Sequence, residues 1–256
     1  MRPRGRRQNL TSSIVQDLGV AIVTGTYSAR NPFPVEAQLC RQYGASRTAL
    51  REAVKMLTAK GLLGARPRHG TWVQPESKWN LLDPDILGWM LERKFSPALL
   101  TEFTEVRLAI EPLAAALAAT AAGRADQQAV RDAVERMRAA ERGEDDPLAS
   151  DIAFHVAVLR ASRNRFFAQL AELTSTALRF SIRMTNRYKG VELASVADHK
   201  RIADAIIAGR PAAAAGAMRR MIREALDLIV THEHAAPAQR RRPAVSRARP
   251  AASASP

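Results

Sequence analysis

The chain has 256 residues, with 39 lysines and arginines against 25 acidic residues, a net charge of +14 and one cysteine, Cys40. This length suggests about two domains, each large enough to bury its own core. A single cysteine excludes an internal disulfide and fits a reducing cytoplasm, and we interpret Cys40 as ordinary helix packing. No apolar run reaches the roughly 20 residues of a membrane-spanning helix, and the arginine-rich start lacks the apolar stretch of a signal peptide.

The net positive charge is confined to the two ends of the chain. Residues 1–75 carry 12 basic and 3 acidic residues, residues 76–235 carry 22 of each, and residues 236–256 carry five arginines and no acid. Such a local basic excess is the electrostatic pattern of a protein that binds a polyanion. The segments 1–9 and 236–256 are predicted to be disordered basic arms, since neither can bury enough apolar surface to fold.

Residues 10–75 are predicted to form a DNA-binding domain of three helices and a two-stranded wing. The first helix covers 10–24, a short second helix follows Pro34, and the third runs over 46–60 and ends at Gly61, as a helix-terminating glycine should. The apolar residues of the third helix recur at helical spacing. They are Leu50, Val54 and Leu57.

The polar residues of the third helix point to nucleic acid. Arg47, Arg51 and Lys55 form a basic stripe about a third of a turn from the apolar face. The stretch Arg66-Pro67-Arg68-His69-Gly70-Thr71-Trp72-Val73 is typical of a wing whose turn lies between Pro67 and Gly70. A solvated helix face is the alternative for the stripe alone. With the wing, the pattern favours a helix-turn-helix whose helix-opening residues meet base edges and phosphates in the major groove.

A linker over 76–83 leads to a second domain, 84–235, that is predicted to be an all-helical bundle, so the fold class is mainly α. Pro84 suits the first position of a helix, and strand signals are absent after it. Apolar periodicity predicts further helices over 97–122, 125–142, 147–161, 164–189, 193–208 and 211–234. The face of the 97–122 helix that is expected to pack in the core carries Phe103, Val106, Ile110, Leu113 and Leu117.

Three ionisable residues fall on apolar helix faces of this bundle. Asp151 and His155 are four residues apart and therefore neighbours on one face, while His199 shares a stripe with Ile202 and Ile206. A carboxylate and two imidazoles are suitable ligands for a divalent transition metal. The alternative is a pair of hydrogen-bonded core histidines.

Arginines on two helices have two interpretations each. Arg107 lies beside the expected core stripe, where it could form an exposed ion pair with Glu111, four residues on, that contributes little. It could instead bind a ligand carboxylate in a closed pocket, which the planar guanidinium suits better than an ammonium. The same alternatives apply to Arg179 and Arg183 on a later helix.

Taken together, these motifs resemble the GntR family of bacterial transcription regulators, and specifically its FadR subgroup, which carries an FCD effector domain. The resemblance covers about residues 10–234. It implies that DNA contacts come from the start of the third helix and from the wing. The residues concerned are Ser46, Arg47, Thr48 and Arg51, with Arg68, His69 and Gly70 in the wing.

The resemblance also implies a ligand site in the helical domain. Asp151, His155 and His199 would hold Zn²⁺ or a similar ion, and Arg107 would bind the carboxylate of an effector. Its helix position alone makes Arg179 a further candidate for that role. Two positions depart from the family pattern. Ala37 stands where many relatives have an arginine that reaches DNA. Met221 stands where many have a third metal-binding histidine, and a thioether is a poor Zn²⁺ ligand. Without a metal, the three residues would contact the effector directly.

The expected function is a homodimeric transcriptional repressor that leaves a palindromic operator when a small acid enters its helical domain. Trp79 to Trp89 at the domain junction resembles the branch of galactonate-operon repressors, which implies a sugar acid such as galactonate. Two other functional classes are the alternatives. A metal-dependent hydrolase or isomerase would use Asp151, His155 and His199 around a water, but no further general base stands at motif spacing. A nonspecific nucleic-acid-binding protein would need no effector.

Overall fold

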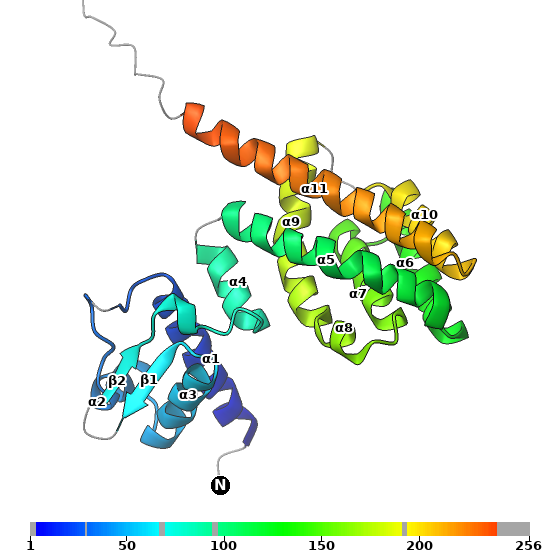
Figure 1. The fold of residues 1–256 in the computed structure, drawn as a ribbon. Helices are drawn as coiled ribbons and strands as arrows, with labels where there is room; N and C mark the ends of the chain where they lie inside the picture. Colours follow the sequence, from blue (N-terminus) through cyan, green and yellow to red (C-terminus); the bar gives the residue numbers. More distant parts are fainter. Residues whose placement is uncertain (1–3, 29, 67–69, 94–96, 191–193, 240–256) are drawn as a thin grey trace, which may run out of the picture.

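A computed structural model describes residues 4–28, 30–66, 70–93, 97–190 and 194–239. Within these residues the chain forms a small N-terminal domain with a two-stranded sheet and a larger domain of helices, joined by a single helix between them (Figure 1). This confirms the predicted mainly α fold class. None of the helices in the described part is long and apolar enough to cross a membrane.

The N-terminal domain packs three helices and a hairpin around one apolar core. The helices are α1 (Arg4–Val23), α2 (Glu36–Tyr43) and α3 (Arg47–Ala59), so the first helix begins six residues before its expected start. Buried residues of α1 recur about every four positions and face the apolar stripe of α3. The residues at the centre of this core include Ile14, Leu18, Ile22, Leu50, Ala53 and Leu57.

The hairpin consists of β1 (Leu63–Arg66) and β2 (Gly70–Val73), which pair antiparallel with Leu63 opposite Val73 and Arg66 opposite Gly70. Gly64 lies beneath the Trp72 ring, and a Cβ at this position would come within 2.4 Å of that ring. The glycine therefore permits the large side chain to lie flat across the hairpin. A short 3₁₀ helix, η1 (Glu76–Lys78), follows within the predicted linker.

Helix α4 (Pro84–Arg93) joins the two domains and packs against both (Figure 1). On one side Trp89 lies over Gly19 of α1, and its ring N–H donates to the Gln16 side chain at 2.7 Å. On the other side Leu87 and Leu91 join an apolar cluster with residues of the larger domain. Because α4 contributes to two cores, it is a structural bridge and not simply the first helix of the bundle.

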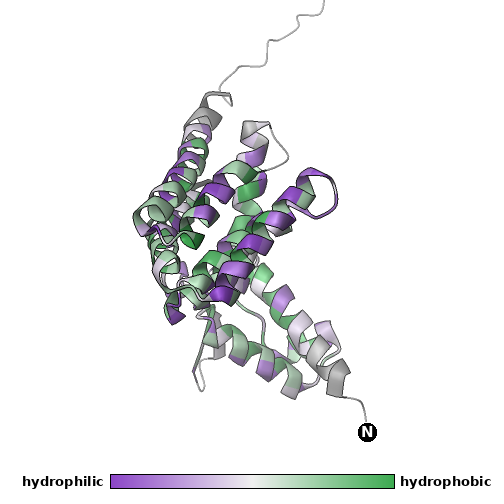
Figure 2. Cartoon of the chain, turned by 90° about the vertical axis from the view of Figure 1, so that its right-hand side faces the viewer, coloured by the Kyte–Doolittle hydropathy of each residue, from purple (hydrophilic) through white to green (hydrophobic). Residues whose placement is uncertain are grey.

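The larger domain contains seven helices in its described residues. They are α5 (Pro97–Ala121), α6 (Arg124–Glu141), α7 (Pro147–Ala161), α8 (Arg165–Gln169), α9 (Ala171–Lys189), α10 (Val196–Ile207) and α11 (Pro211–Gln239). The segment expected as one helix over 164–189 is divided at Leu170 into α8 and α9. Hydrophobic turns gather where the helices meet, and most hydrophilic turns face outward (Figure 2).

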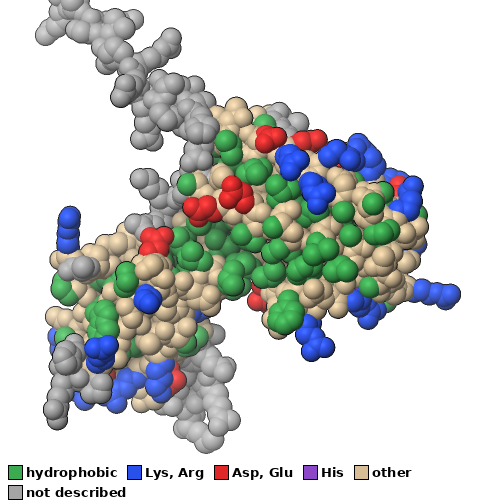
Figure 3. Space-filling view, in the orientation of Figure 1, with side chains coloured by type: hydrophobic (Ala, Val, Ile, Leu, Met, Phe, Trp, Pro, Cys, Tyr) green, Lys and Arg blue, Asp and Glu red, His purple; other side chains and the backbone are tan. Residues whose placement is uncertain are grey.

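The face of α5 that enters the core differs from the expected one. Val106 and Leu113 are 44% and 52% exposed, whereas Arg107, Glu111 and Ala114 on the neighbouring face are buried. Small alanines let α5 lie close against α11, which leaves the larger apolar side chains outside. Figure 3 shows the resulting band of apolar side chains across the face formed by α5 and α11. The prediction that Val106 and Leu113 pack in the core was wrong.

Candidate functional site

The start of α3 presents an exposed polar surface. Gly44 closes α2 with a φ of +57°, in the left-handed region that favours glycine. Two residues later Ser46 caps α3, and its Oγ accepts a hydrogen bond from the Ala49 N–H at 3.3 Å. Arg47 and Thr48, the next two residues, are exposed on the first turn of the helix. The local sequence therefore forms a helix-turn-helix with polar, basic side chains at its accessible end.

Arg51, one turn further along α3, is attached to α2. Its Nε donates to Glu36 Oε2 at 2.9 Å, and the hydrogen bond and charge of Glu36 raise the pKa of the guanidinium. In the wing, Gly70 has a φ of +78° with open space around it. The expected DNA-contacting residues Arg68 and His69 lie outside the described residues.

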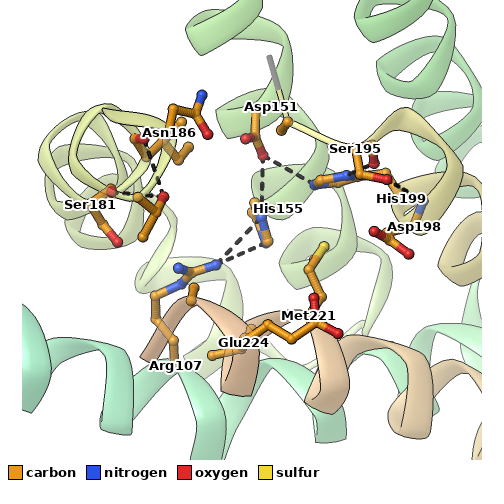
Figure 4. Close-up of a pocket in the computed structure, with 15 residues that line it drawn as sticks. Arg107, Asp151, His155, Ser181, Asn186, Ser195, Asp198, His199, Met221 and Glu224 are labelled. Atoms are coloured by element: carbon orange, nitrogen blue, oxygen red, sulfur yellow. Dashed lines mark hydrogen bonds and ion pairs between the residues drawn. The ribbon is translucent and has the colours of Figure 1, made fainter. Parts of the chain in front are cut away.

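The helical domain contains a cavity of about 260 Å³ whose polar wall includes Asp151, His155 and His199 (Figure 4). Five helices contribute to its lining: α5, α7, α9, α10 and α11. The structure thus brings together the three residues that the sequence singled out as a ligand set. The remaining lining residues are Arg107, Ser181, Ile182, Thr185, Asn186, Ala194, Ser195, Asp198, Met221, Ile222, Glu224 and Ala225.

Hydrogen bonds fix which nitrogen of each imidazole carries a proton. Nδ1 of His155 lies 2.6 Å from Glu111 Oε2, and Nδ1 of His199 lies 2.8 Å from the Ser195 carbonyl oxygen. Both partners can only accept, so both Nδ1 atoms are donors. In a neutral ring, Nε2 then has no proton and carries the lone pair that can accept a hydrogen bond or bind a metal. The two Nε2 atoms face the same Oδ1 of Asp151, at 3.4 Å and 3.2 Å.

This arrangement of acceptors fits a bound cation. With neutral rings, the two Nε2 atoms and Oδ1 of Asp151 are all acceptors, although Nη2 of Arg107 lies 3.4 Å from Nε2 of His155. The ligand atoms of the three residues lie within 4.8 Å of one another. Imidazole nitrogens and a carboxylate oxygen are preferred Zn²⁺ ligands, and metal-binding histidines commonly donate their second N–H to a carboxylate or a carbonyl. A proton on one ring satisfies the acceptors as well. The cluster can therefore hold a metal or an imidazolium.

The charged groups around the cluster keep both of its carboxyl groups ionised. Burial alone would raise the pKa of Asp151, but hydrogen bonds and charge from the two histidines outweigh it and hold that pKa well below its ordinary value. Burial likewise opposes ionisation of Glu111, yet Arg107 and His155 lower its pKa to about 2. Burial would lower the pKa of His155, and the Glu111 and Asp151 carboxylates raise it. Both acids are thus ionised at neutral pH, and the site attracts positive charge.

Arg107 connects this cluster to the cavity. Its Nε donates to Glu111 Oε1 at 2.6 Å, and its Nη2 lies 3.4 Å from each ring nitrogen of His155. The pair with Glu111 is therefore buried, in contrast to the exposed pair considered from sequence. Arg107 also lines the cavity, where its guanidinium can bind an anionic group.

Other residues lie where the sequence did not suggest. Arg179 is exposed and lines a different hollow, together with Arg160 and Glu172, so the structure does not bring it to the cavity with the other expected effector-binding residues. Met221 lines the cavity beside the cluster (Figure 4). The role of Glu111 was missed because its helix face was assigned to solvent. Its spacing of four residues from Arg107 was the available signal.

Comparison with known proteins identifies both parts of the chain. Residues 10–73 match the family described as bacterial regulatory proteins, gntR family, and residues 102–224 match the FCD domain. The galactonate operon transcriptional repressor of Escherichia coli strain K12 is 35% identical over 201 residues, which cover 77% of this chain and 87% of that protein. The HTH-type transcriptional regulator YieP of the same strain is 36% identical over 170 residues, 65% of this chain and 74% of YieP.

A solved structure shares the fold at low sequence identity. It is described as Lar, which controls expression of the Listeria monocytogenes agr system. It aligns with 86% of this chain and 96% of its own, with a TM-score of 0.55 and 17% identity.

Proposed function

This chain belongs to the GntR family of bacterial regulatory proteins, and on that premise we propose that it is a homodimeric repressor that a sugar acid releases from its operator. That it is a DNA-binding transcription regulator with an FCD effector domain follows from the family. The sugar acid, the dimer, the palindromic operator, repression and a cytoplasmic location are the proposed parts.

The observation that carries the proposal is the cavity lined by Arg107 and the Asp151, His155 and His199 cluster. An aldonate has one carboxylate and a row of hydroxyls. Arg107 lines this cavity and provides a charged donor for the carboxylate. Ser181, Thr185 and Asn186 of α9 line the same cavity and offer polar atoms toward hydroxyls. The relative at 35% identity is named for a galactonate operon, which supports an aldonate as the acid.

A divalent metal is the proposed second component of this site. Asp151, His155 and His199 would hold it, and Met221 would leave the position of a third histidine without a nitrogen ligand. When bound, the ion would add positive charge that attracts the oxygens of the effector. If the site binds no metal, a protonated His155 supplies that charge, since its pKa is raised.

Equilibrium dialysis against Zn²⁺, followed by metal analysis, separates these two cases. The proposal expects one ion per chain, lost on Asp151→Asn, whereas the exposed variant Asp132→Asn should retain it. Sugar-acid binding that survives complete removal of metal by a chelator would exclude the metal from the proposal.

The proposed dimer uses the exposed apolar face of α5. Val106 and Leu113 are half-exposed there, with Ile110 and Leu117 beside them, and an apolar band of this kind is a typical subunit interface. Two-fold symmetric regulators bind two successive half-sites of a palindrome with their two recognition helices, which is why a dimer is part of the proposal. Val106→Glu combined with Leu113→Glu should convert the dimer to a monomer in sedimentation experiments, and an unchanged dimer would place the interface elsewhere.

Release from DNA is proposed to occur by linkage between the two domains. The acid must bind the conformation with low DNA affinity more tightly, and a coupling of about 1–3 kcal/mol lowers operator affinity by about 5–150-fold. Helix α9 provides a physical connection, because it lines the cavity at one end and packs against α4 at the other.

Fluorescence anisotropy on DNA from upstream of this protein's own gene tests the function. The measurement uses 150–200 mM salt and excess competitor DNA, with D-galactonate and related aldonates titrated in. Tight binding that one acid releases is the expected result, and Arg47→Ala should abolish that binding without changing the melting temperature. Specific binding that no aldonate disturbs would remove the sugar acid from the proposal, and binding that competitor DNA erases would remove the operator.

A further inference from the structure

An acidic residue lies within the basic surface at the start of α3. Glu36, in the first turn of α2, accepts a hydrogen bond from Arg51 Nε at 2.9 Å. Its second carboxylate oxygen lies 3.9 Å from Arg47 Nε. The side chains of Arg47 and Arg51 are 79% and 66% exposed, so both remain accessible to DNA. One carboxylate thus contacts both arginines that are expected to read the operator.

This acid opposes nonspecific attraction to DNA. Residues 1–75 contain only three acids, and Glu36 is the one that touches the expected DNA-contacting arginines among the described residues. Sequence-independent binding grows with the number of positive charges set against phosphates. A carboxylate beside Arg47 and Arg51 lowers the net positive charge there and therefore weakens sequence-independent binding.

The geometry of the pair determines how Arg51 can contact a base. Because Glu36 occupies Nε, the two Nη groups remain at the free end of the guanidinium, and neither has a partner among the described residues. These two groups form the fork that donates to the O6 and N7 acceptors of guanine in the major groove. Holding Nε in place also reduces the rotational freedom that a free arginine loses on binding.

We propose that Glu36 is a specificity-determining residue that acts by positioning Arg51: it directs the Nη fork toward a base edge and weakens binding to phosphates alone. This inference rests on the proposed placement of α3 in the major groove. Glu36 itself need not touch DNA, so it is a positioning residue.

The test compares Glu36→Gln with Glu52→Gln. Both remove one negative charge from the same domain, but Glu52 pairs with Lys55 at 2.9 Å and forms an ion pair with neither Arg47 nor Arg51 among the described residues. Anisotropy gives the affinity of each variant for the site that the wild-type protein selects from random duplexes and for an unrelated duplex, over a range of salt. Glu36→Gln should bind the unrelated duplex more tightly, with a steeper salt dependence. Its ratio of specific to nonspecific affinity should fall at least about fivefold, which is the smallest discrimination expected from one bidentate contact to a base. Glu52→Gln should leave that ratio unchanged.

The Arg51→Ala background shows whether Glu36 acts through Arg51. In that background Glu36→Gln should lower the ratio much less than in the wild-type protein, because only Arg47 then faces the carboxylate. A ratio that falls equally with Glu36→Gln and Glu52→Gln, or that falls as much without Arg51 as with it, would overturn the inference. The underlying assignment fails in a different way: if Arg51→Ala leaves specific binding intact, α3 does not read the operator through this residue.

Discussion

Glu111 allows the most quantitative test of the buried cluster. Its carboxylate accepts hydrogen bonds from Arg107 and from His155, both at 2.6 Å, and all three residues are at most 5% exposed. Glu111→Gln keeps the shape of the side chain and removes its charge. The buried guanidinium then has no counter-ion at its Nε, and His155 loses the acceptor that fixes its tautomer, because the amide offers both donor and acceptor atoms.

The pKa of Glu111 provides the magnitude of the effect. It falls from 4.5 to about 2, and at about 1.4 kcal/mol for each pH unit this favours the ionised form by about 3 kcal/mol. Removal of one partner from a buried ion pair costs about 3–5 kcal/mol in other proteins, which agrees. We therefore expect Glu111→Gln to lower the free energy of unfolding of the helical domain by about 3–4 kcal/mol. For a protein of this size, that corresponds to a decrease in Tm of roughly 6–16 °C.

The two domains can be followed separately in this experiment. All three tryptophans, Trp72, Trp79 and Trp89, lie in the wing, the linker and α4, so their fluorescence reports the N-terminal part, while far-ultraviolet circular dichroism reports mainly the bundle. Both are recorded at pH 7 in excess chelator. Glu105→Gln on the exposed side of the same helix is the control and should change stability by less than about 0.5 kcal/mol. A Glu111→Gln bundle that melts with the control would refute the reasoning.

Three further outcomes follow from the structure. In metal-free protein, the stabilisation from ionised Glu111 is complete above pH 4.5 and is lost as pH falls toward about 2, because the pKa of Glu111 is lowered by folding. The stabilisation from protonated His155 is complete below pH 6.5 and is lost as pH rises through its raised folded pKa. Urea melts should therefore give a stability maximum between about pH 5 and 6.5, and a bundle most stable at pH 8 would contradict this. Gly64→Ala places a Cβ within 2.4 Å of Trp72 and should destabilise the N-terminal domain by about 1–3 kcal/mol, measured by tryptophan fluorescence. Gly216→Ala, in α11 with room for a Cβ, should instead stabilise the bundle by about 0.4–1 kcal/mol in circular-dichroism melts, and a loss of stability would show that the helix is crowded there.

The N-terminal domain could be predicted from sequence because its signals are local. Ser46 and Gly61 mark the ends of α3, as their cap and positive-φ positions in the structure confirm. Asp151 and His155 were predictable neighbours for the same reason, since residues four apart on a helix share a face. His199 comes from another helix, and its place on an apolar helix face, together with the family resemblance, connected it to them.

The packing of α5 could not be predicted in this way. Its sequence offers two apolar faces, one with large residues such as Val106 and Leu113 and one with small alanines beside Arg107 and Glu111. Size alone favours the large residues as core. The close approach of α11 reverses this choice, because only small side chains fit between two adjacent helix backbones. The burial of Arg107 and Glu111 depends on that long-range contact, so their role in the cavity was open until the fold was known.

The central claim is that an acid bound by Arg107 controls DNA binding. The most direct measurement is the concentration of D-galactonate, or of whichever aldonate is active, that releases half of the operator from the wild-type protein and from Arg107→Lys. Lysine keeps a cation beside Glu111 but lacks the second donor of the fork. We expect equal operator affinity without the acid and at least tenfold more acid needed for release from Arg107→Lys. Release of both proteins at the same concentration would contradict the account.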